Sequence, residues 1–315
     1  MVSLTYTRSC PICQQNIYKN LFHPRHSPGC VVRCGECDFI YIAEFQNKNS
    51  LIVEGPVLSR LDTRIPTNTN LNDHLKSHWK LSQMPAEFVE IPAERHNSLE
   101  ALQRVGKYHS NGRILDFGCG WGFFLSIAKE KGWECHGLEP LAGHSLYARA
   151  KFGLEVVTDT LRDDTFPKNY FDVITAFQVF EHLPDPALTL KQLQTFQKSD
   201  GLILIEVPNI DTWGVRLLGG RYRHFNPDHI NFFSKRTLRS FLESNHYEVL
   251  ELYYPNRYLT LNRFINYWLR RTLPSSVVNP LSKFIRHHGW LERIIKINLG
   301  DILGVVARKP DMSLT

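Results

Sequence analysis

From Gly112 onward, short apolar runs alternate with stretches of helical length and periodicity. Five of these runs are RILDF (113–117), WECHGLE (133–139), LEVVT (154–158), FDVITAFQV (171–179) and GLILIEV (201–207). Strands that alternate with helices of this length predict a mostly parallel sheet covered on both faces, which is a doubly wound α/β fold. A fold of this class binds ligands outside the carboxyl ends of its strands, so functional residues are expected there.

A glycine loop follows the first predicted strand in the stretch ILDFGCGWG. Gly118, Gly120 and Gly122 stand where the strand turns into a helix, and Asp116 precedes them by two residues. Glycines at such a turn allow positive φ angles and close approach of the backbone to a ligand. The loop therefore predicts a cofactor site.

The acidic residues near the loop distinguish between cofactors. The dinucleotide fingerprint needs a glycine at position 123, where this chain has Phe123. Asp116 would repel a pyrophosphate, but it suits a ligand that carries an ammonium and a sulfonium, such as S-adenosylmethionine. Glu139 ends the second strand, where a carboxylate can accept hydrogen bonds from a ribose diol.

With these motifs in place, residues 111 to the end resemble the class I S-adenosylmethionine-dependent methyltransferases. The matching pieces are LDFGCGWG, HGLEP, FQVFEHLPDP and LIEVPN, while HFNPDHINFFSKRTL resembles a subgroup from natural-product and cell-surface polysaccharide pathways. The resemblance implies a seven-stranded sheet closed by a reversed strand, with residues 247–254 and 302–309 as the closing pair. The cofactor contacts implied or predicted here are Asp116, Gly118, Cys119, Gly120, Gly122, Glu139, Asp159, Thr160 and Gln178.

These residues are expected to have different roles in binding the cofactor. The glycines would lie under the methionine moiety, Glu139 would hold the ribose, and Asp159 or Thr160 would meet the adenine. Gln178 ends the fourth strand, where members of the family contact cofactor or acceptor. Cys119 lies inside the loop, and its alternative role is that of a small residue that packs against its neighbours.

Three histidines are candidates for a general base, which methyl transfer to a hydroxyl requires. His182 follows the fourth strand, and His224 and His229 follow the fifth, in the loop expected to cover the acceptor. His229 is the preferred base. The alternative is structural: His182 would cap a helix or bond a carbonyl, and His229 would pack under Phe232 and Phe233.

Two cysteine pairs near the start are spaced like the ligands of a structural zinc ribbon. Cys10 and Cys13 form C-x2-C, and after a gap of 20 residues Cys34 and Cys37 form a second such pair. Redox chemistry is the rival interpretation, and Cys30, His23 and His26 are competing ligands. Because a segment of this size can bury little apolar surface, zinc is expected to support its folding.

The chain is expected to have three parts: a zinc-ribbon-like domain over 1–43, a linker with helices over 44–110, and a methyltransferase domain over 111–315. Within the linker, one helix is predicted over 72–81 and another over 96–109, with Asn97 or Ser98 as its N-cap. A basic helical insertion is predicted at about 253–300.

The basic insertion carries eight cations against one anion, while the chain as a whole has a net charge of +6. Its segments NRFINYWLRRTL and NPLSKFIRHHGWLERIIKI are amphipathic. One interpretation is peripheral contact with a membrane surface, which would suit a lipid-linked substrate. The other is a lid or homodimer contact whose apolar stripe is buried.

Composition narrows the function further. No apolar run approaches the length of a membrane span, and the first residues lack a signal peptide, so the cytoplasm is the expected location. The leading prediction is methyl transfer to a small molecule, a sugar or secondary metabolite, most often at a hydroxyl. The alternatives are an RNA methyltransferase with a zinc-bearing recognition domain, disfavoured because the cations lie far from the ribbon, and a noncatalytic cofactor-binding scaffold.

Overall fold

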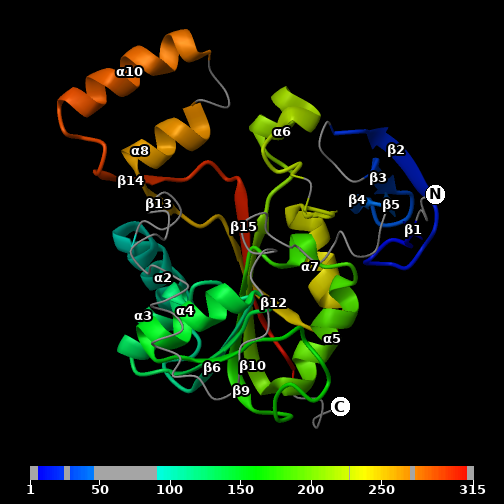
Figure 1. The fold of residues 1–315 in the computed structure, drawn as a ribbon. Coiled ribbons are helices and arrows are strands. Elements are labelled where there is room, and N and C mark those ends of the chain that lie inside the picture. The colour runs from blue at the N-terminus through cyan, green and yellow to red at the C-terminus, as the bar shows by residue number, and fades with distance from the viewer. Residues whose placement is uncertain (1–5, 25–28, 46–90, 227, 270–273, 311–315) are drawn as a thin grey trace.

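The computed structural model describes residues 6–24, 29–45, 91–226, 228–269 and 274–310 (Figure 1). The helix predicted over 72–81 lies outside these residues, as does most of the predicted linker. Within the described part of the chain, none of the helices has both the length and the hydropathy needed to cross a membrane.

A seven-stranded sheet forms the centre of the molecule. In spatial order its strands are β12 (Glu248–Tyr253), β15 (Ile302–Arg308), β10 (Gln197–Pro208), β9 (Phe171–Phe177), β6 (Arg113–Phe117), β7 (Glu134–Leu138) and β8 (Glu155–Val157). The pairs from β10 to β8 are parallel, whereas β15 runs antiparallel to both β10 and β12. The predicted doubly wound sheet with a reversed seventh strand is confirmed.

Helices cover both faces of this sheet (Figure 1). The helical elements of this region are α2 (Ile91–Val105), α3 (Phe123–Glu130), α4 (Ala142–Phe152), η3 (Phe180–His182), α5 (Pro186–Phe196), α6 (Trp213–Leu218), η4 (Gly219–Arg221) and α7 (Lys235–Ser244). One apolar core joins the sheet to α2, α3 and α4, and a second joins it to α5 and α7. The central strands are apolar on both faces because both faces are covered.

Helix α2 begins earlier than predicted. The sequence indicated Asn97 or Ser98 as the N-cap, but the helix starts at Ile91 and both residues lie inside it. The Asn97 side chain instead pairs with the backbone of Tyr258, donating to its carbonyl at 3.2 Å and accepting from its N–H at 2.9 Å. A tertiary contact therefore uses the side chain that looked like a helix cap.

The basic insertion is only partly helical. It is framed by the antiparallel strands β13 (Arg257–Thr260) and β14 (Ile294–Ile297), which enclose α8 (Leu261–Arg263), the π-helix η5 (Phe264–Leu269) and α10 (Ser275–His287). The β-branched and aromatic residues of RYLT and IIKI could have indicated these two strands. The sequence interpretation gave more weight to the cations and amphipathic helical stretches between them.

Helix α10 has two apolar rows. Val278 and Ile285 are buried in a small core with Ile265, whereas Val277, Leu281 and Phe284 are 52%, 41% and 53% exposed. Among the residues that the structure describes, only one row of this helix is therefore covered.

The N-terminal segment forms a small four-stranded sheet. Its order is β11 (Asn231–Phe232), β4 (Ile40–Ile42), β3 (Val31–Cys34) and β2 (Tyr18–Phe22), and a separate short pair joins β1 (Tyr6–Thr7) to β5 (Glu44–Phe45). The strand β11 comes from the later part of the chain, after β10. Phe39 and Tyr41 belong to the same core as Phe233 and Phe241, so the N-terminal segment is packed on the α5 and α7 face of the main domain (Figure 1).

Candidate functional site

The glycine loop lies at the carboxyl ends of β6 and β7. Gly118 and Cys119 donate their N–H groups to the carbonyl of Leu138 at 2.8 and 3.2 Å, which ties the loop to the neighbouring strand. The loop glycines all have positive φ, and Gly122 directly precedes α3. A Cβ on Gly120 would meet nothing within 4 Å, so this glycine leaves open space beside the loop.

Two carboxyl groups lie beside the loop. Asp116 is buried and accepts a hydrogen bond from the Thr175 hydroxyl at 2.8 Å. Burial raises the pKa of Asp116 to about 7, and the nearby Glu139 acts in the same direction. Glu139 accepts the N–H groups of Gly120 and Leu141, each at 2.9 Å, so it holds the loop in place.

Next to the loop is a cavity of about 290 Å³, called here the glycine-loop cavity. The loop contributes Gly118, Cys119, Gly120 and Trp121, and Asp116 lies at its base. The opposite wall comes from α2 and from residues 253–257. This arrangement encloses a ligand-sized space between the sheet edge and α2.

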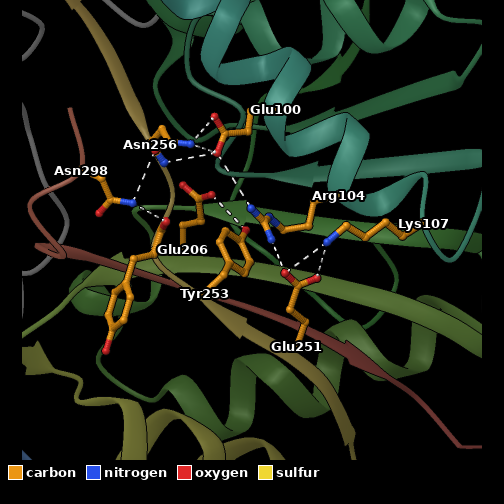
Figure 2. Close-up of polar contacts among 9 residues, drawn as sticks. Glu100, Arg104, Lys107, Glu206, Glu251, Tyr253, Asn256 and Asn298 are labelled. Atoms are coloured by element: carbon orange, nitrogen blue, oxygen red, sulfur yellow. Dashed lines mark hydrogen bonds and ion pairs between the residues drawn. The ribbon is translucent and has the colours of Figure 1, made fainter. Parts of the chain in front are cut away.

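A polar network fixes that wall (Figure 2). Arg104 of α2 forms an ion pair with Glu251 and stacks its guanidinium 3.6 Å from the Tyr253 ring centroid. Tyr253 donates its hydroxyl to Glu206 at 3.0 Å, and Asn256 donates to Glu100 at 2.8 Å. Because the network joins α2 to β12 and β10, it holds α2 over the cavity.

Gln178 directly follows β9 in a strained backbone conformation. Its φ of 58° lies in the left-handed region, which a non-glycine residue adopts at some energetic cost. Its backbone N–H and its side-chain amide both donate to the Glu206 carbonyl, at 2.8 and 3.2 Å. The residue lines the glycine-loop cavity and also a second cavity beside it.

The second cavity, called here the histidine cavity, has a volume of about 190 Å³. It shares Glu94, Gln178 and Arg257 with the glycine-loop cavity, so the two are neighbours. Its lining is polar and is formed by Glu94, Gln178, Glu181, His182, Pro208, Arg223, His224, Asn226, His229, Arg257, Tyr258, Leu259, Arg263, Ile297, Asp301 and Ile302. The three predicted histidines therefore meet in one place.

Backbone carbonyls orient two of these rings. His229 Nδ1 lies 2.9 Å from the His224 carbonyl, and His182 Nδ1 lies 2.9 Å from the Asp228 carbonyl. A carbonyl oxygen only accepts, so each Nδ1 carries the proton and each Nε2 has a free lone pair. Burial lowers the pKa of His229 to about 4 and that of His224 to about 2, so both rings are neutral at pH 7.

The four predicted cysteine ligands lie together. Their Sγ atoms are all within 4.8 Å of one another, with Cys10 to Cys37 at 3.5 Å and Cys13 to Cys34 at 3.4 Å. A tetrahedral zinc site with Zn–S bonds of about 2.3 Å needs sulfurs about 3.8 Å apart, so this donor set fits zinc. Cys30 lies apart from the cluster and donates to the Phe22 carbonyl at 3.4 Å.

Arg8 links the cysteine segment to the histidine cavity. Its guanidinium donates to the carbonyls of Ile42, Pro184 and Ile230 at 2.8, 2.9 and 2.6 Å, and to the Asn231 side chain at 3.0 Å. Ile230 and Pro184 lie one and two residues from His229 and His182. The position of both histidines therefore depends on contacts with the N-terminal segment.

The structure brings together some predicted cofactor residues and not others. Asp116, Gly118, Cys119, Gly120 and Gln178 line the glycine-loop cavity. Asp159 is paired with Arg162 on an exposed loop, and neither it nor Thr160 belongs to the cavity lining. The sequence interpretation did not include Glu181, Glu206 or Arg257. For Glu181, a signal was present in the sequence: Glu181 and His182 stand next to each other shortly after β9, where functional residues are expected.

A doubly wound sheet with a glycine loop and acidic groups at its first two strand ends defines a cofactor-binding α/β protein. Residues 92–252, just over half of the chain, match a family described as a methyltransferase domain. The chain belongs to this methyltransferase-domain family.

Curated relatives agree over a shorter region. The chain is 30% identical over 142 residues to the ubiquinone biosynthesis O-methyltransferase of Yersinia enterocolitica, and 31% identical over 143 residues to that of Yersinia pestis strain Pestoides F. These matches cover 42% of this chain and 58% of each relative.

Among solved structures, a SAM-dependent methyltransferase from Archaeoglobus fulgidus is 22% identical. The match covers 68% of this chain and 94% of that protein, with a TM-score of 0.45.

Proposed function

We propose that this protein transfers a methyl group from S-adenosylmethionine to a hydroxyl of a small molecule, a sugar or a secondary metabolite. The observation that carries this proposal is the contact between two cavities, one beside the glycine loop and one lined by histidines, which share Gln178, Glu94 and Arg257. Methyl transfer needs two ligands held side by side, and alignment of the two is its main requirement.

The glycine-loop cavity fits the cofactor. Gly120 leaves open space there, and Asp116 is a buried carboxyl at the base that would face the ammonium of the methionine moiety. Bound S-adenosylmethionine supplies a methyl group on a sulfonium, which is a good leaving group. We keep Glu139 as the ribose ligand and Asp159 or Thr160 as adenine contacts as part of this proposal.

Cofactor affinity is expected to depend on pH through Asp116. The pKa of this carboxyl is about 7 in the free protein, and a cationic ligand favours its ionised form. Below pH 7, binding must therefore displace a proton, and affinity should fall by up to about tenfold per pH unit. Above pH 7 the Asp116 carboxyl should contribute no further pH dependence.

Isothermal titration with the cofactor at about pH 5.5 and about pH 8 would measure this difference. Asp116→Asn should bind more weakly at high pH and lose the pH dependence. A wild-type affinity that is equal at both pH values would contradict the role of Asp116.

The histidine cavity is the proposed acceptor site. His229 has a free lone pair on Nε2, and its Nδ1–H is held by the His224 carbonyl, so the ring is fixed and neutral. In this arrangement Nε2 can take the proton of an acceptor hydroxyl. His182 lies at a ring-centroid distance of 4.7 Å and offers a second Nε2, and His224 is the third candidate.

Replacing His229 with alanine is expected to lower turnover at least about tenfold, because a positioned base contributes 10²- to 10⁴-fold in general. Cofactor affinity should stay nearly unchanged, since His229 does not line the glycine-loop cavity. Steady-state rates of S-adenosylhomocysteine release, together with cofactor titration, would measure both effects. Unchanged turnover would refute the assignment.

We also propose that Cys10, Cys13, Cys34 and Cys37 bind a structural zinc ion, because four clustered thiolates leave no open position for catalysis. Thiolate ligands need reduced cysteines, which supports the cytoplasm as the place of the reaction. The sequence also predicts that the basic insertion contacts a membrane surface or a second copy of the chain. The exposed row of α10 supports this prediction.

Two other functions compete with this proposal. An RNA methyltransferase would need a basic surface near the cavities, and a noncatalytic scaffold would bind cofactor without turnover. Incubation with labelled cofactor, with RNA and with a panel of nucleotide sugars and phenols, separates the three. Transfer only to RNA favours the first alternative, and cofactor binding without transfer to any acceptor favours the second.

A further inference from the structure

The glutamate before His182 is fully buried. Glu181 has no exposed surface, and neither of its carboxylate oxygens has a hydrogen-bond partner among the described residues. A buried carboxyl in this state is costly, because it has lost its hydration and gained no hydrogen bond.

Two imidazoles face this carboxylate. One ligand atom from each of Glu181, His182 and His229 lies within 4.8 Å of the others. His182 Nε2 is 3.9 Å from a Glu181 oxygen, and the His182 and His229 rings meet edge-on at 78°. Both Nε2 atoms carry lone pairs because both Nδ1–H groups are bound to backbone carbonyls.

This is the pattern of ligands around a bound metal ion. Metal-ligating histidines donate their other ring N–H to a backbone carbonyl or carboxylate, which fixes the tautomer before the ion arrives. Two imidazoles and one carboxylate form a set that suits divalent first-row metals and leaves coordination positions open. Two of the three arginines of the same lining have acidic partners, Arg223 with Asp301 and Arg263 with Glu94.

We propose that Glu181, His182 and His229 bind a divalent first-row cation in the histidine cavity, and that its open positions take the acceptor hydroxyl. This role rests on the proposed methyl transfer. Because the cation would occupy the Nε2 lone pair of His229, it would replace the base role of that ring. A hydroxyl bound to such a cation is more acidic, so it can release its proton to solvent. The oxygen then forms the bond to the methyl carbon as the carbon–sulfur bond breaks, and S-adenosylhomocysteine leaves with the bonding pair.

Such a site gives the two histidines a common task. Their Nδ1 atoms are both held by backbone carbonyls, so the Nε2 lone pairs are oriented for a metal before it binds. The cation would also give the buried Glu181 carboxylate a partner, which the described residues do not provide as a hydrogen bond. The acceptor would be a compound with a hydroxyl that can reach a metal from the side of the shared residues Gln178 and Arg257.

Mn²⁺ is the best probe, because it prefers nitrogen and oxygen ligands and competes weakly for the four thiolates. Titration of the full-length protein with Mn²⁺, followed by the loss of the free-ion electron paramagnetic resonance signal, should reveal a single site per chain. Glu181→Gln, which keeps the shape of the side chain, should weaken Mn²⁺ binding at least about tenfold, and His229→Gln should do the same.

His224→Gln is the matched control, since His224 is buried in the same cavity but outside the ligand set. It should leave Mn²⁺ binding unchanged. If Glu181→Gln does not fold, His182→Gln replaces it. Absence of Mn²⁺ binding to the wild-type protein, or equal binding by the ligand variants, overturns the proposal.

Cofactor titration on the same samples separates this inference from the proposed function. Mn²⁺ binding without cofactor binding would refute methyl transfer and leave the cation site intact. Cofactor binding and turnover that need no divalent cation, in a protein that binds no Mn²⁺, would refute the cation site alone.

Discussion

Replacing Gly120 with valine is expected to weaken cofactor binding by at least about 100-fold, which corresponds to roughly 2.7 kcal/mol. Gly120 has a φ of 52° and borders the glycine-loop cavity, and no atom within 4 Å would resist a Cβ there. The added side chain therefore occupies the space in which we place the cofactor. Isothermal titration with S-adenosylmethionine would measure the loss.

Gly132→Val is the matched control. Gly132 also has a positive φ, 89°, and open space around its missing Cβ, but it lies at the far end of α3 and does not line the cavity. Both variants carry a similar backbone strain, so thermal unfolding should shift alike. Equal cofactor affinities for the two variants would refute the assignment of the cavity.

Replacing Cys34 with serine is expected to remove the zinc and to lower turnover at least about tenfold, because a structural zinc site contributes folding energy directly. Strand β4 pairs with β11, and Arg8 binds the carbonyl next to His229. Unfolding of the N-terminal segment would therefore release the histidine cavity. Cofactor affinity should change little, since the glycine-loop cavity has no lining residue from that segment.

Cys30→Ser is the control for this experiment, because Cys30 belongs to the same segment but lies outside the cluster. It should keep its zinc, measured by elemental analysis, and its turnover. If Cys34→Ser retains a full complement of zinc, the four-cysteine site is wrong. If it loses zinc but keeps its turnover, the link between the segment and the acceptor site is wrong.

Local patterns in the sequence were enough to predict the main sheet. Each strand from β6 to β10 has an apolar run, and helical stretches separate most of these runs in the sequence. The reversed strand β15 followed from the family resemblance. The cysteine cluster was equally clear, because metal ligands on a turn keep a fixed spacing. These features are determined by residues close together in the chain.

The acceptor site could not be predicted in this way. His182 and His229 were candidates, but their meeting with Glu181 depends on β11, which pairs with a strand from the opposite end of the chain. The start of α2 was missed for a similar reason, since Asn97 bonds to Tyr258 in the insertion. In both cases a long-range contact decides what a polar side chain does.

The shared sheet of β4 and β11 also bears on how this protein is made. The first strands of that sheet are synthesised early. The Ile230 carbonyl, to which Arg8 donates a hydrogen bond, is synthesised 222 residues later. Until then Ile42 and Tyr41 belong to a strand with an open edge, which can pair wrongly with other chains. Because this pairing is so non-local, we expect the protein to refold slowly from denaturant. We also expect its folding to benefit from chaperones that shield strand edges.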